Sequence, residues 1–265
     1  MILVGHKKDA NGLRRTRRLF TTLNKTAVPV RKRDIISLDE DDVMAIIARR
    51  LVLTNPSFRD PKIAVISSQN IPAGNRVCLT TIANLYDLLK LIFSHDVGRS
   101  SNRRLRFNRP SDEQLDRYYL LATSYFESIG EAFAPVGELF AANDPAKVTA
   151  KYRGPRGGHL LFRPLGLEIF TRVAIQYASE NHIEITESVR RLRTVPTDLD
   201  KLPYRGVLWN PIRNNLVVKG KTLAHGLLRY MAGLEARPDE LLRQYKEALG
   251  AEPGDRSVKL PGRVV

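Results

Sequence analysis

Apolar residues recur along this chain mainly at the three- and four-residue spacing of amphipathic helices. The pattern predicts helices over residues 12–24, 37–51, 81–93, 111–129, 164–178, 223–234 and 238–249. Short apolar runs predict strands at 1–4 and 63–66 and a hairpin formed by 207–209 and 216–218. Because helices dominate and the strands do not alternate regularly with them, the expected fold class is α+β, predominantly helical with a few short strands.

Helix-capping signals support two of these predictions. Ser37 with Glu40, and Ser111 with Gln114, have the spacing of a capping box. The first helix also carries charges of the sign that its dipole favours at each end: Asp39, Asp41 and Asp42 at the start, Arg49 and Arg50 at the end. Residues 99–109 and 145–158 lack an apolar period, so we expect an exposed loop and an irregular segment there.

No internal repeat and no clear linker divides the 265 residues. The stretch at 143–158, rich in Gly and Pro, is the best candidate for a boundary. We therefore expect a first region over 1–143, a mixed helical and hairpin region over 144–252, and a flexible tail over 253–265.

Positive charge is the most unusual property of the sequence. Lys and Arg number 43 against 28 Asp and Glu, a net charge of +15. Such an excess concentrates anions around a protein and makes nucleic acid the first partner to consider. Arg suits phosphate particularly well because its planar group donates two parallel hydrogen bonds.

The bases gather in three clusters, and scattered, solvated bases are the alternative interpretation of each. The first lies between residues 7 and 33, where Asp9 is the one acid. The second is Arg99, Arg103, Arg104, Arg106 and Arg109, and the third is Lys147, Lys151, Arg153, Arg156 and Arg163. The residues that we predict to contact nucleic acid are Lys7, Lys8, Arg14, Arg15, Arg17, Arg18, Lys25, Arg31, Lys32, Arg33, Arg103, Arg104, Arg106, Arg156 and Arg163.

Signals for other chemistry are weak. The single Cys78 excludes an internal disulfide and fits a reducing, cytoplasmic location. No apolar run has the length of a membrane span, and we expect no membrane partner. The five histidines lack metal-ligand spacing, so we expect no metal and no cofactor.

Two glycine-containing segments are candidates for a phosphate-binding site. Gly220, Lys221 and Thr222 match the end of a P-loop, but Asn215 stands where its first Gly belongs. The segment 154–158 is either an anion-binding nest beside Arg156 or a flexible turn.

One segment resembles a known family. Residues 14–25, followed by Val-Pro-Val at 28–30 and the acidic run at 39–42, resemble the DGQHR-domain family, typified by DndB of bacterial DNA phosphorothioation systems. The residues on the family's pattern are Phe20, Asn24, Lys25, Pro29 and Asp42. Residues 157–164 resemble its later Phe-Arg-Pro element, so the resemblance covers about 14–234. The Asp-Gly-Gln-His-Arg signature has no counterpart, which suggests a truncated member.

The resemblance implies a remnant of a ParB-like domain followed by a helical region. It also implies a DNA-binding or regulatory protein of DNA phosphorothioation or a related defence system, with DNA and other modification or defence proteins as partners. No catalytic residue can be assigned, so an enzyme is the less favoured hypothesis. A nucleotide hydrolase or DNA-processing enzyme using Lys221 or Arg156, and a basic subunit that binds an acidic protein, are the alternatives.

Overall fold

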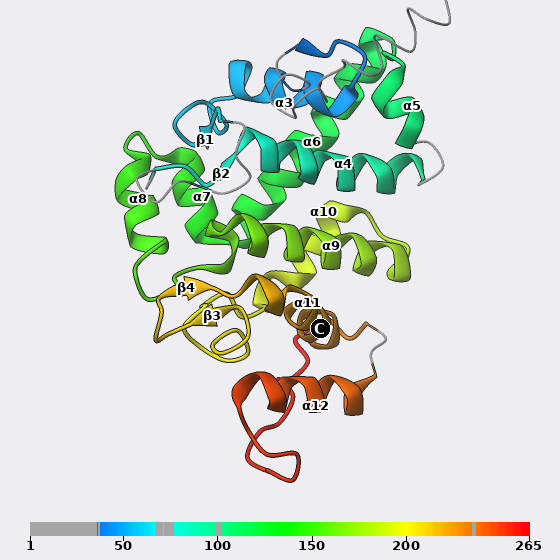
Figure 1. The fold of residues 1–265 in the computed structure, drawn as a ribbon. Helices are drawn as coiled ribbons and strands as arrows, with labels where there is room; N and C mark the ends of the chain where they lie inside the picture. Colours follow the sequence, from blue (N-terminus) through cyan, green and yellow to red (C-terminus); the bar gives the residue numbers. More distant parts are fainter. Residues whose placement is uncertain (1–35, 37, 67–70, 72–76, 99–101, 235–236) are drawn as a thin grey trace, which may run out of the picture.

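The computed structural model describes residues 36, 38–66, 71, 77–98, 102–234 and 237–265. Element labels follow Figure 1. The structure is mostly helical with a few two-residue strands, as the sequence predicts. The longer helices are α3 (Val43–Thr54), α4 (Ile82–Val97), α6 (Asp112–Ala132), α9 (Pro164–Asn181), α11 (Lys221–Met231) and α12 (Pro238–Leu249).

Shorter elements connect these helices. The short α-helices are α5 (Asn102–Phe107), α7 (Ala134–Ala141), α8 (Pro145–Tyr152) and α10 (Ile185–Arg191). The 3-10 turns are η2 (Leu160–Phe162), η3 (Leu192–Thr194) and η4 (Val218–Gly220). Strands β1 (Ile63–Ala64) and β2 (Thr80–Thr81) pair in parallel, whereas β3 (Trp209–Asn210) and β4 (Asn215–Leu216) form an antiparallel hairpin.

The helices follow one another in a stack. Helix α4 packs against α3 on one side and α9 on the other, α11 packs against α9, and α12 packs against α11 (Figure 1). Helix α6 lies behind this stack and packs closely against α10. One cluster of buried apolar side chains runs from α3 through α6 and α9 to α12. The contacts of α4 with α9 and of α6 with α10 therefore cross the boundary that we expected near residue 143.

Helix α3 begins later than predicted. Its N-cap is Asp42, whose carboxylate accepts hydrogen bonds from the Ala45 N–H at 3.1 Å and the Tyr86 O–H at 2.6 Å. Asp42 is buried, and the loss of hydration raises the pKa of its carboxyl group. The predicted cap Ser37 lies outside the described residues. Because α3 continues to Thr54, beyond the predicted end at residue 51, Arg49 and Arg50 fall in its middle instead of at its end.

The capping box of α6 is confirmed. The Ser111 hydroxyl accepts the Gln114 N–H at 3.3 Å, and the Gln114 side chain accepts the Ser111 N–H at 3.2 Å. The end of α12 is confirmed as well, because Gly250 terminates it in the left-handed conformation, with φ at +69°.

Two segments predicted to be irregular are partly helical. Pro145 occupies the start of α8, where proline is favoured, so the irregular segment is confined to 153–158. In the Arg-rich stretch, α5 forms around the buried Leu105. The predicted strands at 207–209 and 216–218 form a hairpin that is shifted toward its turn.

Residues 253–265 contain no helix or strand, yet they contact the body of the protein. The Val264 N–H donates to the Met231 carbonyl at 2.8 Å, and the Val264 carbonyl accepts the Thr194 hydroxyl at 3.2 Å. No helix within the described ranges has both the length and the apolar character needed to cross a membrane.

Candidate nucleic-acid interface

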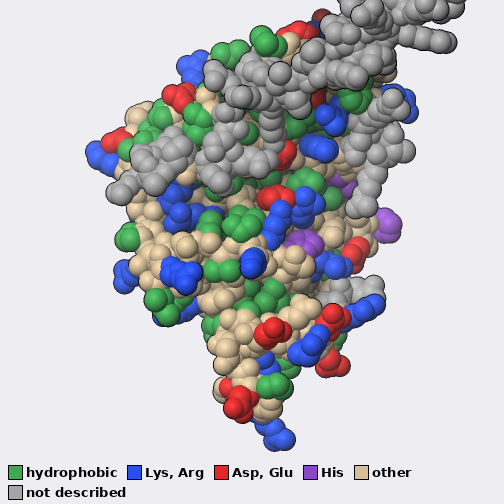
Figure 2. Space-filling view, in the orientation of Figure 1, with side chains coloured by type: hydrophobic (Ala, Val, Ile, Leu, Met, Phe, Trp, Pro, Cys, Tyr) green, Lys and Arg blue, Asp and Glu red, His purple; other side chains and the backbone are tan. Residues whose placement is uncertain are grey.

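The first basic cluster, residues 7–33, lies outside the described part of the chain. So do Phe20, Asn24, Lys25 and Pro29 of the family pattern, whereas Asp42 is the buried cap of α3. Residues 1–35 hold ten of the 43 Lys and Arg and two of the 28 Asp and Glu. More than half of the net charge therefore belongs to this segment. Elsewhere, Figure 2 shows Lys and Arg side chains interspersed with Asp and Glu.

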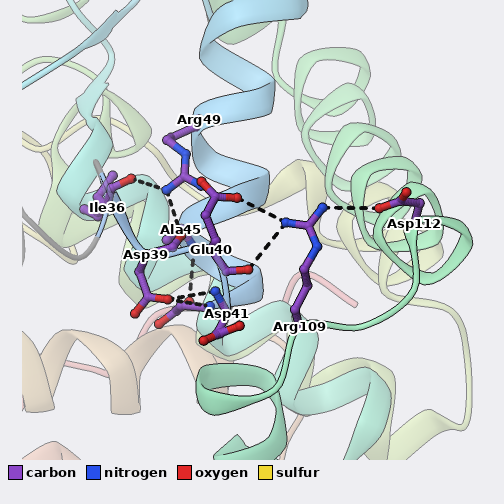
Figure 3. A network of polar contacts seen from close by, with 9 residues as sticks. Ile36, Asp39, Glu40, Asp41, Ala45, Arg49, Arg109 and Asp112 are labelled. Atoms are coloured by element: carbon purple, nitrogen blue, oxygen red, sulfur yellow. Dashed lines mark hydrogen bonds and ion pairs between the residues drawn. The ribbon is translucent and has the colours of Figure 1, made fainter. Parts of the chain in front are cut away.

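Arginines of the second cluster are partly neutralised by carboxylates. Arg109 lies between Glu40 at 3.1 Å and Asp112 at 3.2 Å (Figure 3). Glu40 also pairs with Arg49 at 2.6 Å, so one carboxylate serves two arginines. The Nε atom of Arg106 lies 4.0 Å from Asp42. Arg104 is exposed, whereas Arg99 and the side chain of Arg103 lie outside the described part.

In the third cluster, too, several bases contact carboxylates or backbone carbonyls. Lys147 pairs with Asp144 at 3.3 Å, and Lys151 pairs with Glu138 at 3.1 Å. Arg153 points inward, where it donates to the carbonyls of Leu79 at 2.7 Å and Phe162 at 2.8 Å. These contacts tie α8 to β2 and η2. Lys147, Lys151 and Arg153 thus have structural partners, and none of the three is among the residues that we predicted to contact nucleic acid.

Arg163 contacts the backbone of the glycine-rich loop at residues 154–158. Its guanidinium donates to the Gly157 carbonyl at 2.8 Å and lies 5.5 Å from the Trp209 ring centroid. Burial lowers the pKa of Arg163 to about 10. Gly157 has φ at +88°, and a Cβ there would lie 3.2 Å from Trp209, so this position requires glycine. The loop 154–158 is therefore a packed turn against β3.

Arg156 immediately precedes Gly157, the residue of this turn that lies against Trp209 of β3. It is exposed, as are Arg213 in the hairpin turn and Lys219 in η4. No described carboxylate lies within ion-pair distance of these three side chains, whose positive charges are open to solvent. Figure 2 shows Lys and Arg side chains over the region where Figure 1 draws β3 and β4. Helix α5, which carries Arg104, lies far from this hairpin (Figure 1).

Hydrogen bonds hold the backbone of the turn in the β3–β4 hairpin. The Asn210 side chain accepts the N–H groups of Ile212 and Arg213, both at 3.0 Å, and Asn214 adopts the left-handed conformation. The buried Trp209 anchors β3 in the core. Ile212 is 90% exposed at the tip. The turn therefore presents one apolar and one cationic side chain on a backbone that these hydrogen bonds hold in place.

Arg213 and Lys219 were missed by the sequence analysis, although a signal was present. Residues 201–234 contain six Lys and Arg and no Asp or Glu. Because these six bases are spread over 34 residues, they do not form a visible run. The absence of acids over that length would have identified the segment.

The P-loop fragment has another structural role. Lys221 donates to both oxygens of Glu168, at 2.7 and 2.8 Å, which joins α11 to α9. A Cβ at Gly220 would lie 1.9 Å from the Val207 carbonyl oxygen, so glycine is needed for this close backbone contact. Both residues are thus accounted for by packing.

No family model, curated protein or solved structure matches this chain. In the described ranges, no group of three His, Cys, Asp or Glu side chains is arranged to hold a metal ion. The function must therefore be argued from charge and geometry.

Proposed function

We propose that this protein binds duplex DNA, as a DNA-binding or regulatory protein of a bacterial DNA phosphorothioation or related defence system. The observation that carries the proposal is the positive charge without acidic neighbours at the β3–β4 hairpin, in a chain of net charge +15. Arg156, Arg213 and Lys219 supply exposed cations there. The cluster at residues 7–33 adds bases to the same molecule.

Phosphate contacts account for the expected affinity. Each Lys or Arg that neutralises a phosphate releases condensed counterions, so binding weakens steeply as salt rises. The β3–β4 hairpin is an antiparallel pair of strands, and two-stranded ribbons fit the major groove of B-DNA. Such contacts position the protein on DNA and carry no base sequence by themselves.

Salt-dependent binding to a short duplex tests the proposal. We expect Arg156→Gln combined with Arg213→Gln to reduce the slope of log K against log salt by about 2, since each phosphate contact contributes about 0.9. Replacing Arg14, Arg15, Arg17 and Arg18 by Ala should reduce it further. The measurement is fluorescence anisotropy of a labelled duplex over a salt series.

Arg237→Gln provides the matched control. Arg237 is exposed, pairs with Glu240 at 3.7 Å and precedes α12, so its loss removes one charge away from the hairpin. The slope should stay unchanged in this variant. Absent binding, or binding that is insensitive to salt, would contradict the proposal.

The phosphorothioation context rests on the resemblance at residues 14–42 and needs its own test. Two duplexes of one sequence, with and without phosphorothioate linkages, should differ in affinity if the protein acts in that system. Equal affinities would leave DNA binding in place and remove support for the modification role.

A further inference from the structure

A pocket opens between α4, α9 and α11, away from the hairpin. Its volume is about 450 Å³, within the range of small-molecule sites. Polar side chains from all three helices line it, among them His95, Arg172, Gln176, Glu180 and His225. Leu91 and Ile175 add apolar surface. Figure 2 shows histidine side chains beside Lys or Arg in the region of α4 and α9.

Polar side chains at this pocket lack hydrogen-bond partners. The Gln176 Oε1 and His225 Nε2 atoms are buried and have no partner among the described residues. Arg229 Nε, one helical turn beyond His225 on α11, is also unpartnered but does not belong to the side chains that line the pocket. Buried polar atoms are almost always hydrogen-bonded, so the two unpartnered atoms of pocket residues, on α9 and α11, point to a ligand.

Two rows of polar side chains with four-residue spacing, called ladders here, face each other, one on α9 and one on α11. Glu168, Arg172, Gln176 and Glu180 follow one another on α9, and Lys221, His225 and Arg229 on α11. Ion pairs join the ends of the ladders. Lys221 and Arg172 share Glu168 at 2.7 and 2.8 Å, and Arg229 lies 3.9 Å from Glu180. Gln176 and His225 remain unpaired in the middle.

The charges of the ladders favour an anion in this gap. Three cations, Lys221, Arg172 and Arg229, face two carboxylates, Glu168 and Glu180. Burial and these three cations lower the pKa of His225, while Glu168 opposes them. A bound anion would offset the cations and allow His225 to take up a proton.

We propose that this pocket binds a small organic oxyanion, a phosphate monoester or a carboxylate. Its anionic group accepts hydrogen bonds from His225 and Arg172, which line the pocket, and Arg229, one turn along α11, adds positive charge nearby. Its uncharged body lies against Leu91 and Ile175, and a ligand hydroxyl donates to Gln176. The site is independent of the DNA-binding proposal, because neither Arg156 nor the β3–β4 hairpin takes part in it.

Histidine signals in NMR spectra provide the test. The chain has five histidines, so labelling only the histidine ring carbon Cε1 with carbon-13 gives one signal for each histidine, and His225→Gln assigns the one of interest. The probes are phenyl phosphate and 3-hydroxybenzoate, with 3-hydroxybenzyl alcohol as the uncharged control. We expect one or both anions to shift the His225 signal saturably, whereas the alcohol leaves it in place. His159, which lies outside the pocket, should not respond.

Variants identify the anion-binding groups. Arg172→Gln should weaken binding about tenfold or more, since a charge-assisted hydrogen bond contributes about 1.5–3 kcal/mol. Arg229→Gln should weaken it less, because it removes a nearby positive charge and no hydrogen bond to the ligand. Arg193→Gln, at an exposed position on η3, is the control and should bind like the wild type.

A pH series gives a second readout. The carboxylate of 3-hydroxybenzoate stays ionised from pH 5.5 to 8, so any pH dependence there comes from the protein. The pKa of His225 should rise in the bound state, and affinity should increase as the pH falls. Three results would overturn the proposal: no saturable shift with either anion, an equal shift with the alcohol, or unchanged affinity in Arg172→Gln and in folded Arg229→Gln.

Discussion

Arg156 and Arg163 lie seven residues apart and illustrate how environment decides the role of a charge. Arg163 donates to the Gly157 carbonyl and packs over Trp209, whereas Arg156 is exposed without a described carboxylate nearby. Both belong to one basic cluster in the sequence. The packing of the turn against β3 makes Arg163 a structural residue and leaves Arg156 as a surface cation.

His159 gives a prediction for stability against pH at the scale of one residue. Burial lowers its pKa from 6.5 to about 4, and its ring packs against Phe133, Tyr152 and Phe162. The unfolded chain takes up a proton below about pH 6.5, whereas the folded protein does not until about pH 4. Folding stability should therefore decrease as the pH falls from about 6.5 to about 4, by at most about 3.4 kcal/mol from this group.

Urea unfolding between pH 7 and pH 4 measures this contribution. In His159→Asn the carboxamide can still accept the Leu161 N–H, but the titrating ring is gone. Its stability should depend less on pH than that of the wild type. His182→Asn, an exposed position with left-handed backbone that Asn tolerates, should keep the wild-type dependence. Identical profiles for the wild type and His159→Asn would contradict this role.

At the scale of elements, the capping box of α6 gives the clearest prediction. Ser111→Ala removes the hydroxyl that accepts the Gln114 N–H and should cost about 1 kcal/mol of stability. Ser124→Ala is the control, because Ser124 is exposed within the same helix and has no capping role. Thermal unfolding of both variants checks the difference. A loss in Ser124→Ala as large as that in Ser111→Ala would show that capping is not the cause.

The elements that could be predicted from sequence are those with local causes. Ser111, Pro164 and Gly250 mark helix ends through contacts within a few residues, and the structure has those ends. The start of α3 depends instead on Asp42, whose partner Tyr86 is 44 residues away. The short α5 contains the buried Leu105 and packs against α3, which lies far away in the sequence. Tertiary contacts of this kind leave no local periodic signal.

The candidate site was less predictable for the same reason. Arg109 is neutralised by Glu40, 69 residues earlier, and Arg50 by Asp116, 66 residues later. A count of charges along the sequence cannot show which bases meet carboxylates in the fold. The pocket between α4, α9 and α11 was missed entirely, although the four-residue spacing of its polar residues is visible in the sequence.

At the scale of the whole molecule, the packing predicts cooperative unfolding. Apolar contacts of α6 with α10 and of α4 with α9 join the parts before and after residue 143. We expect one transition in urea, with the far-ultraviolet and near-ultraviolet circular dichroism changing together. Two separate transitions would instead favour the boundary near residue 143 that the Gly and Pro content suggests.

The contact of Val264 with Met231 has a practical consequence for handling the protein. Any tag, fluorophore or fusion partner attached after residue 265 would emerge beside the last turn of α11 and η3, close to Thr194 and Tyr230. Attachment there competes with native hydrogen bonds. An appended sequence needs a spacer before its first bulky group, and cleaving the appendage should restore the melting temperature of the untagged chain.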